Sequence, residues 1–295
     1  MKKIGFIGIG TMGTPMVRNL LKAGFELIIC YRAAEKAKAL VEFGAKVVSS
    51  PADVARQCEV VITMLPADRA VTEVVTGADG IAEGASAGLV VIDSSTVLPA
   101  TSKRIAAELA KLQVEVLDAP VTGSEPQAVD GQLTFLVGGK AAVYEKCTPL
   151  FKAMGKLSFH MGPNGAGSYT KLSNNTISAI SLVAFAEGVV MATKAGINPQ
   201  LFVEVISQGG ARSGQIANKA PKILSRDFHA NFATALMYKD LGLAGEVAKE
   251  FNVPTPALAI AREMLNIAIA KGYGQEDVCS VVKCYEEWAH IEVRK

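Results

Sequence analysis

Short apolar runs alternate with amphipathic segments through the first half of the chain. Buried parallel strands appear as apolar runs of about four to eight residues, whereas helices repeat their apolar positions about every 3.6 residues. The expected strands lie at residues 3–7, 26–31, 45–48, 59–65, 89–93, 114–118, 132–139 and 156–160. The expected helices lie at residues 14–24, 34–43, 51–56, 67–76 and 99–112. This alternation predicts an α/β fold with a doubly wound, mostly parallel sheet.

The pattern changes after the glycine-rich segment 162–167. Strand-like runs cease, and residues 168–195 form one long helical stretch rich in Ala, Val and Leu. Further helices are predicted at residues 199–207, 232–250, 256–271 and 276–289. We therefore expect a first domain at residues 1–163 and an all-α domain at 164–295, linked by a long interdomain helix. So long an apolar helix is hard to bury in one small domain, which predicts a domain or subunit interface.

A glycine-rich segment joins the first strand to the first helix, and it consists of Gly8, Ile9, Gly10, Thr11, Met12 and Gly13. The GxGxxG pattern alone is weak, but a strand, a helix and a second strand within about 30 residues form the dinucleotide-binding unit. Gly8 would permit a tight turn, Gly10 the approach of a pyrophosphate, and Gly13 close packing of helix and strand. The helix N-terminus offers N–H donors to phosphates. The segment predicts a Rossmann domain that binds a dinucleotide.

The end of the second strand indicates which dinucleotide is bound. An NAD site usually has a carboxylate there for the ribose 2′-hydroxyl, but this chain has Tyr31 and Arg32. Arg32 can hold a 2′-phosphate with its planar guanidinium, and Lys36 adds positive charge one turn further on. We predict NADP (NADPH) as the cofactor, with NAD possible because Arg32 tolerates both. The alternative is that Arg32 is a solvated surface cation.

Composition narrows the class of protein. The 295 residues suffice for two domains, half of them are hydrophobic, and the net charge of +2 gives no reason to propose a nucleic-acid partner. No uninterrupted apolar stretch approaches the length of a membrane span, and the N-terminal pattern is not that of a signal peptide. The five cysteines lack metal-binding spacing. We expect a cytoplasmic protein with reduced thiols, no metal and no membrane contact.

A nicotinamide enzyme that reduces a carbonyl needs a proton donor beside the hydride acceptor. The three histidines have no Asp or Glu at a spacing that would orient them, so we interpret them as structural or solvated. Lys171 lies near the start of the long helix, and Asn175 follows at i+4 on the same face. Such a pair is more often a solvated helix face, so spacing alone leaves its role open.

Six motifs follow one another along the chain. They are GFIGIGTMG at 5–13, MLP at 64–66, DSST at 93–96, DAPVTG at 118–123, GAGSYTKLSNN at 165–175 and KDL at 239–241. In this order they resemble the 3-hydroxyacid dehydrogenase family, which includes 3-hydroxyisobutyrate dehydrogenases and tartronate semialdehyde reductases. The resemblance runs essentially from end to end.

The resemblance implies roles for individual residues. Lys171 matches the general acid/base of the family, Asn175 matches the residue that holds the substrate, and Lys239 matches a lysine that closes over the nicotinamide. The substrate carboxylate would be bound largely by backbone N–H groups of Thr122, Gly123 and Ser124. The residues that would lie along the cofactor are Met64, Leu65, Pro66 and Thr96.

Departures from the family pattern leave the substrate open. The family usually has Ser-Gly-Gly where this chain has Thr122-Gly123-Ser124, so a serine side chain would make the pocket smaller or more polar. Residues 125–131 resemble the tartronate semialdehyde reductase branch, whereas residues 171–175 resemble the hydroxyisobutyrate branch. Phosphogluconate dehydrogenases carry a histidine at the position of Asn174, and its absence argues against oxidative decarboxylation of a sugar phosphate.

The resemblance implies an NAD(P)-dependent oxidoreductase that interconverts a short 3-hydroxy acid and its semialdehyde, as a homodimer or homotetramer. Two alternatives are a catalytically silent cofactor-binding or scaffold protein on the same fold, and a reductase of imines or of other small aldehydes. Retention of Lys171, Asn175 and Lys239 argues against the silent protein. The segment 118–124 argues against the imine reductase, which needs no carboxylate pocket.

Overall fold

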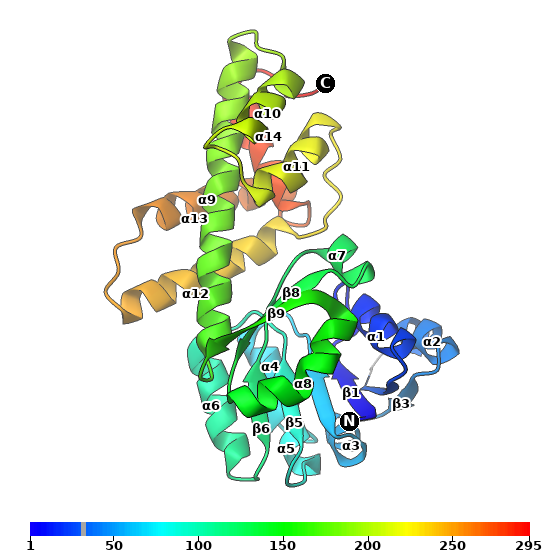
Figure 1. The fold of residues 1–295 in the computed structure, drawn as a ribbon. Helices are drawn as coiled ribbons and strands as arrows, with labels where there is room; N and C mark the ends of the chain where they lie inside the picture. Colours follow the sequence, from blue (N-terminus) through cyan, green and yellow to red (C-terminus); the bar gives the residue numbers. More distant parts are fainter. Residues whose placement is uncertain (31–33) are drawn as a thin grey trace. The chain divides into compact units, whose positions relative to one another are not determined.

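The computed structural model of the chain describes the backbone of residues 1–30 and 34–295, and the side chains of residues 1–30 and 37–295 (Figure 1). The chain separates into two compact units, Met1–Lys171 and Leu172–Lys295. Each unit has its own buried hydrophobic cluster. The units are described here one at a time.

A sheet of nine strands, counted over the described residues, forms the centre of the first unit (Figure 1). Six strands run parallel in the order β3-β2-β1-β4-β5-β6. They are β1 (Lys3–Ile7), β2 (Glu26–Cys30), β3 (Lys46–Val48), β4 (Val60–Thr63), β5 (Val90–Asp93) and β6 (Glu115–Asp118). The sheet continues through β7 (Val121–Thr122), β8 (Leu133–Gly138) and β9 (Gly155–Gly162). Strand β8 runs antiparallel to its neighbours β6 and β7, and β9 runs parallel to β8, so the predicted mostly parallel, doubly wound sheet is confirmed.

Both faces of the central strands, such as β1, β4 and β5, are buried. Alternate strand residues face opposite sides, so Phe6 and Ile62 belong to one hydrophobic cluster while Val61 and Val91 belong to another. This double burial explains why the strands read as continuous apolar runs. The helices of this unit are α1 (Gly13–Lys22), α2 (Ala34–Glu42), α3 (Pro51–Gln57), α4 (Asp68–Thr76), α5 (Ile81–Gly84), α6 (Pro99–Ala110), α7 (Glu125–Val129) and α8 (Ala141–Met154).

The second unit is helical, as the sequence predicted. Its helices are the continuation of α9 (Ala166–Lys194), then α10 (Pro199–Gln208), α11 (Gly214–Leu224), α12 (Thr234–Glu250), α13 (Pro256–Ala268) and α14 (Val282–Ala289). Two short turns of non-α helix, Ile269–Tyr273 and Val278–Val281, precede α14. Its core packs residues such as Leu182 and Val189 of α9 against Leu241 of α12 and Leu265 of α13.

The long apolar helix α9 has the length and composition of a candidate membrane span. By length and composition alone it could cross a membrane, and 44% of its most apolar window is buried inside the chain. The earlier expectation rested on uninterrupted apolar runs, whereas α9 intersperses uncharged polar residues such as Ser173 and Thr176 among apolar ones. Core helices of soluble proteins share these properties, so the helix alone is weak evidence for a membrane.

Candidate active site

The turn between β1 and α1 contains glycines of two kinds. Gly8 and Gly13 are required by close packing, whereas Gly10 borders open space among the described residues. Gly8 has φ +104°, and a Cβ there would lie 2.2 Å from the Met64 carbonyl oxygen. A Cβ on Gly13 would lie 2.0 Å from the Gly8 carbonyl oxygen, so only glycine lets helix and strand approach. A Cβ on Gly10 would meet no atom within 4 Å in the part of the chain that the structure describes. No side chain caps α1. An uncapped N-terminus beside open space fits the pyrophosphate of a dinucleotide.

Gly10→Ala is expected to weaken NADPH binding about tenfold, equivalent to about 1.4 kcal/mol, because the added methyl group takes space that the cofactor needs. The same variant should unfold like the wild type, since the methyl group meets no atom of the described residues within 4 Å. Isothermal titration and urea unfolding measure the two effects. Gly13→Ala is the contrasting control, because its Cβ collides with backbone and should destabilise the fold. An unchanged dissociation constant in Gly10→Ala would contradict this assignment.

Hydrogen bonds fix the ends of β4 and β5, where the cofactor segments were predicted. Asp93 Oδ1 accepts from Thr63 Oγ1 at 2.8 Å and from the Ser95 N–H at 3.1 Å. The Ser95 hydroxyl in turn accepts from the Leu65 N–H at 2.9 Å. Burial raises the pKa of Asp93, and its hydrogen bonds to Ser95 and Thr63 act in the opposite direction. These contacts join the backbone that carries Met64, Leu65 and Pro66 to the segment that contains Thr96.

The structure does not describe the side chains that were predicted to bind the adenosine end of the cofactor. Tyr31 and Arg32 lie outside the described residues, and the structure describes only the backbone of Lys36. The predicted contact with a 2′-phosphate therefore stays a prediction.

A carboxylate at the end of β6 caps the helix that carries Lys171. Asp118 Oδ1 accepts from the Gly165 N–H at 2.7 Å, and Oδ2 accepts from the Ser168 N–H at 3.0 Å. A Cβ on Gly167 would lie 2.3 Å from the Leu136 carbonyl oxygen, so the first turn of α9 rests directly on the sheet. Burial raises the pKa of Asp118, while the two N–H donors oppose this shift. Asp118 thus fixes the turn that immediately precedes Lys171, whose side chain is half-buried.

The predicted substrate segment follows Asp118 directly. Thr122 ends β7, Gly123 has φ +119°, and Ser124 precedes α7. The Ser124 N–H and hydroxyl both donate to Gln127 Oε1, each at 2.8 Å. One of the backbone N–H groups assigned to a substrate carboxylate therefore already has a partner in this chain. The sequence analysis gave Gln127 no role, although Ser124-x-x-Gln127 has the spacing of a capping box.

In the second unit, two predicted site residues, Asn175 and Lys239, both contact the carboxylate of Asp240, to which the sequence analysis gave no role. Asn175 is buried, and its Nδ2 donates to Asp240 Oδ2 at 2.7 Å. Lys239 Nζ lies 3.0 Å from Asp240 Oδ1. Asn174 Nδ2 donates to Asn175 Oδ1 at 3.1 Å. Asp240 is only 2% exposed, so it orients both Asn175 and Lys239 from a buried position.

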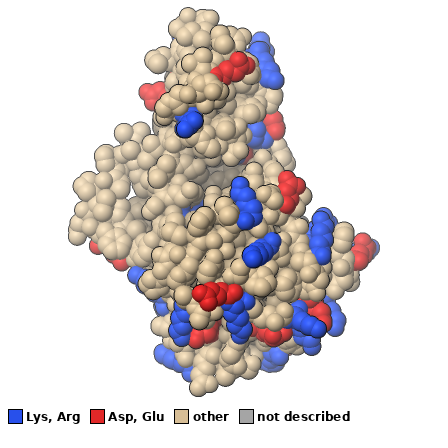
Figure 2. Space-filling view, in the orientation of Figure 1, with Lys and Arg blue, Asp and Glu red and all other residues tan. Residues whose placement is uncertain are grey.

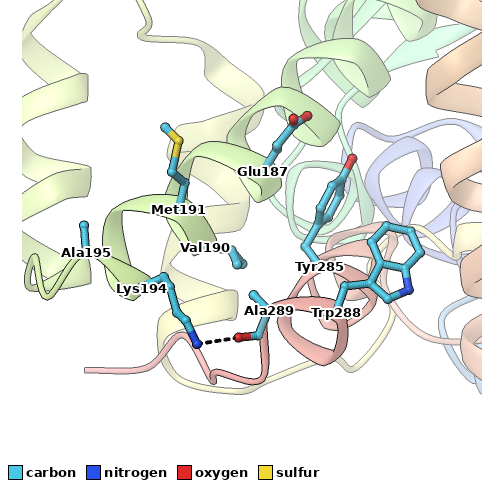
Figure 3. A pocket seen from close by; sticks show the side chains of 8 residues that line it. All are labelled: Glu187, Val190, Met191, Lys194, Ala195, Tyr285, Trp288 and Ala289. Carbon is cyan, nitrogen blue, oxygen red and sulfur yellow. Dashed lines mark hydrogen bonds between the residues drawn. The ribbon is translucent and has the colours of Figure 1, made fainter.

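An open groove on the second unit contains no predicted site residue. It has a volume of about 530 Å³ and lies between α9 and α14 (Figure 3). At its edge Lys194 Nζ donates to the Ala289 carbonyl oxygen at 2.8 Å. Its lining is Glu187, Val190, Met191, Lys194, Ala195, Tyr285, Trp288 and Ala289. Elsewhere, acidic and basic side chains are interspersed on the face shown in Figure 2 and form no broad basic patch there.

Both parts of the chain match known protein families. Residues 3–162 match the NAD binding domain of 6-phosphogluconate dehydrogenase. Residues 165–285 match the NAD-binding domain of NADP-dependent 3-hydroxyisobutyrate dehydrogenase. Together the two matches cover nearly the whole chain.

Individual relatives align with this chain over nearly its whole length. The chain is 37% identical to 2-(hydroxymethyl)glutarate dehydrogenase of Eubacterium barkeri, over 99% of this chain and 97% of that protein. It is 36% identical to an NAD-dependent L-serine dehydrogenase of Pseudomonas aeruginosa, over 97% and 98%. Among solved structures, 3-hydroxyisobutyrate dehydrogenase of Mycobacterium tuberculosis with L-serine superposes with a TM-score of 0.89, at 29% identity, over 97% of this chain and 99% of that one.

Proposed function

Because the chain belongs to the 3-hydroxyisobutyrate dehydrogenase family, whose members are NAD(P)-dependent 3-hydroxyacid dehydrogenases, we propose that it interconverts a short 3-hydroxy acid and its semialdehyde with a preference for NADP(H). The structural observation that carries the proposal is the carboxylate of Asp118. It caps the helix of Lys171 and also begins the segment that leads to Thr122. The silent scaffold and the imine reductase are not favoured, since the full-length relatives are dehydrogenases of hydroxy acids.

Each residue of the proposed site acts through its own chemistry. A bound NADPH supplies the hydride for the aldehyde carbon. Lys171 donates a proton to the developing alkoxide and accepts one in the reverse direction. Asn175 positions the substrate, and the segment from Thr122 to Ser124 holds its carboxylate. Lys239 closes over the nicotinamide and is oriented by Asp240.

We assign cofactor binding to residues 1–163 and substrate binding with oligomerisation to residues 164–295. The two family matches meet between residues 162 and 165, which supports this division. The cofactor residues in the first domain are Gly8, Ile9, Gly10, Thr11, Met12, Gly13, Met64, Leu65, Pro66 and Thr96. The preference for NADP rests on Arg32 and Lys36 in the sequence. One relative is NAD-dependent, so the family name alone does not decide the cofactor.

A homodimer or homotetramer is the proposed assembly, in the cytoplasm. Several large apolar side chains of the second unit are exposed, including Met191 at 72%, Ile177 at 67% and Val205 at 62%. Trp288 and Met191 also line the groove between α9 and α14 (Figure 3). Exposed apolar surface of this kind favours contact with another subunit. Cys58, Cys147, Cys279 and Cys284 form no disulfide bond, which supports a reducing compartment.

Initial rates of NADPH and NADH oxidation against a set of small aldehydes test the proposed function. The set contains tartronate, succinic, methylmalonate and malonate semialdehydes together with glyoxylate. We expect rapid oxidation of NADPH with at least one of the tartronate, methylmalonate and malonate semialdehydes, whose products are 3-hydroxy acids, and slower oxidation of NADH. No rate with any of them, in protein that still binds NADPH, would contradict the proposal. A faster rate with NADH would refute the role given to Arg32.

A further inference from the structure

In this chain the proposed substrate segment, Thr122 to Ser124, is also in contact with a side chain, that of Gln127. The N–H of Ser124 can only donate, so the carboxamide atom 2.8 Å from it is an acceptor and is therefore Oε1 of Gln127. The hydroxyl of Ser124 donates to the same oxygen. These two bonds fix the orientation of the amide and leave Nε2 outside this contact.

The rest of the Gln127 side chain packs beneath the segment. A Cβ placed on Gly123 would lie 3.1 Å from Gln127 Cβ and 3.7 Å from Gln127 Cγ. The glutamine stem thus fills the space that a side chain at position 123 would use. The Gln127 side chain is only partly buried. Within the described residues Nε2 makes no hydrogen bond, so it offers two N–H donors at the proposed carboxylate segment.

We propose that Gln127 determines substrate specificity by favouring semialdehydes with a hydroxyl group, rather than a methyl group, on the carbon between carboxylate and aldehyde. The inference rests on the proposed function of the same site. A hydroxyl group accepts a hydrogen bond from Nε2, whereas a methyl group at that place removes water from Nε2 and gives it no partner. Sites built to bond a substrate hydroxyl discriminate strongly against analogues that lack it. Ser124 acts with Gln127, because it holds the carboxamide in this orientation.

Tartronate semialdehyde and methylmalonate semialdehyde form a matched pair for the test, since they differ only in hydroxyl against methyl at that carbon. The measured quantity is the ratio of their kcat/KM values with NADPH. We expect the wild type to favour the hydroxylated substrate at least about tenfold. In Gln127→Leu this ratio should fall about tenfold through loss of activity on the hydroxylated substrate, with NADPH affinity unchanged. Gln132→Leu is the matched control, because Gln132 is exposed nearby and should leave the ratio unchanged.

Gln127→Glu separates recognition from a purely structural role. Its carboxylate still accepts from the Ser124 N–H and hydroxyl, so the start of α7 is retained, but it has no N–H to donate. We expect the ratio to fall in this variant as well, but by less than in Gln127→Leu, because the substrate hydroxyl can donate to the new carboxylate instead. A ratio within twofold of the wild type in both variants overturns the inference, even if both rates fall together. A wild type that reduces both substrates without preference, or reduces neither while it reduces another aldehyde of the set above, overturns the inference alone. A wild type that reduces none of the set overturns the proposed function with it.

Discussion

Replacing Lys171 with alanine is expected to lower kcat about a thousandfold while NADPH still binds with unchanged affinity. A positioned general acid contributes about 10²–10⁴-fold to rate, and an alanine leaves only water to protonate the alkoxide. The cofactor segments at Gly8 to Gly13 and at Met64 to Pro66 make no use of this side chain in the proposed site. Steady-state kinetics with the best semialdehyde and fluorescence titration with NADPH measure the two quantities.

Lys152→Ala is the control for this variant. Lys152 lies on α8 of the same unit, and its side chain is exposed. Its removal should change neither kcat nor NADPH affinity. If Lys171→Ala kept more than a tenth of the wild-type kcat, the proton would have to come from another group and the assignment of Lys171 would be wrong.

Asp118→Ala is expected to lower both stability and turnover. Two buried N–H groups, those of Gly165 and Ser168, lose their acceptor, and each such loss costs about 1–3 kcal/mol. Because these bonds fix the first turn of α9, Lys171 also loses its position, and we expect kcat to fall about a hundredfold. Urea unfolding gives the first effect, and steady-state kinetics below the unfolding transition gives the second.

The matched control is Asp130→Ala, which removes an exposed carboxylate just after α7. Its stability and kcat should match those of the wild type. An Asp118→Ala protein that is destabilised but turns over at the wild-type rate would show that the cap supports the fold without positioning Lys171.

The fold was largely predictable because local sequence patterns indicate most of its strands and helices and the order in which they follow one another. Strands buried on both faces appear as apolar runs. Ser50 stands directly before the predicted helix at 51–56 and caps α3, with its Oγ accepting from the Asp53 N–H at 3.0 Å. The sequence analysis missed α5, α7, α8, α11 and the two-residue strand β7. Most of these are short, and α8 and α11 contain a proline inside the helix, which reads as a break.

The candidate site was predictable only where its residues are near in sequence. Lys171 and Asn175 are four positions apart, so helical periodicity brings them to one face. Asp118 meets Gly165 and Ser168 across 47 and 50 residues, and Asp240 meets Asn175 across 65. No local pattern predicts such contacts. Gln127 is different, because its spacing from Ser124 was visible as a capping-box pattern.

Hydride transfer from cofactor to substrate tests the central claim most directly. The protein is incubated with tartronate, methylmalonate or malonate semialdehyde and with NADPH that carries deuterium at the transferred position of C4, and the product acid is analysed by mass spectrometry. The account predicts a 3-hydroxy acid with one deuterium on the carbon that was the aldehyde. A hydroxy acid without deuterium, or oxidation of NADPH without formation of the acid, would contradict it.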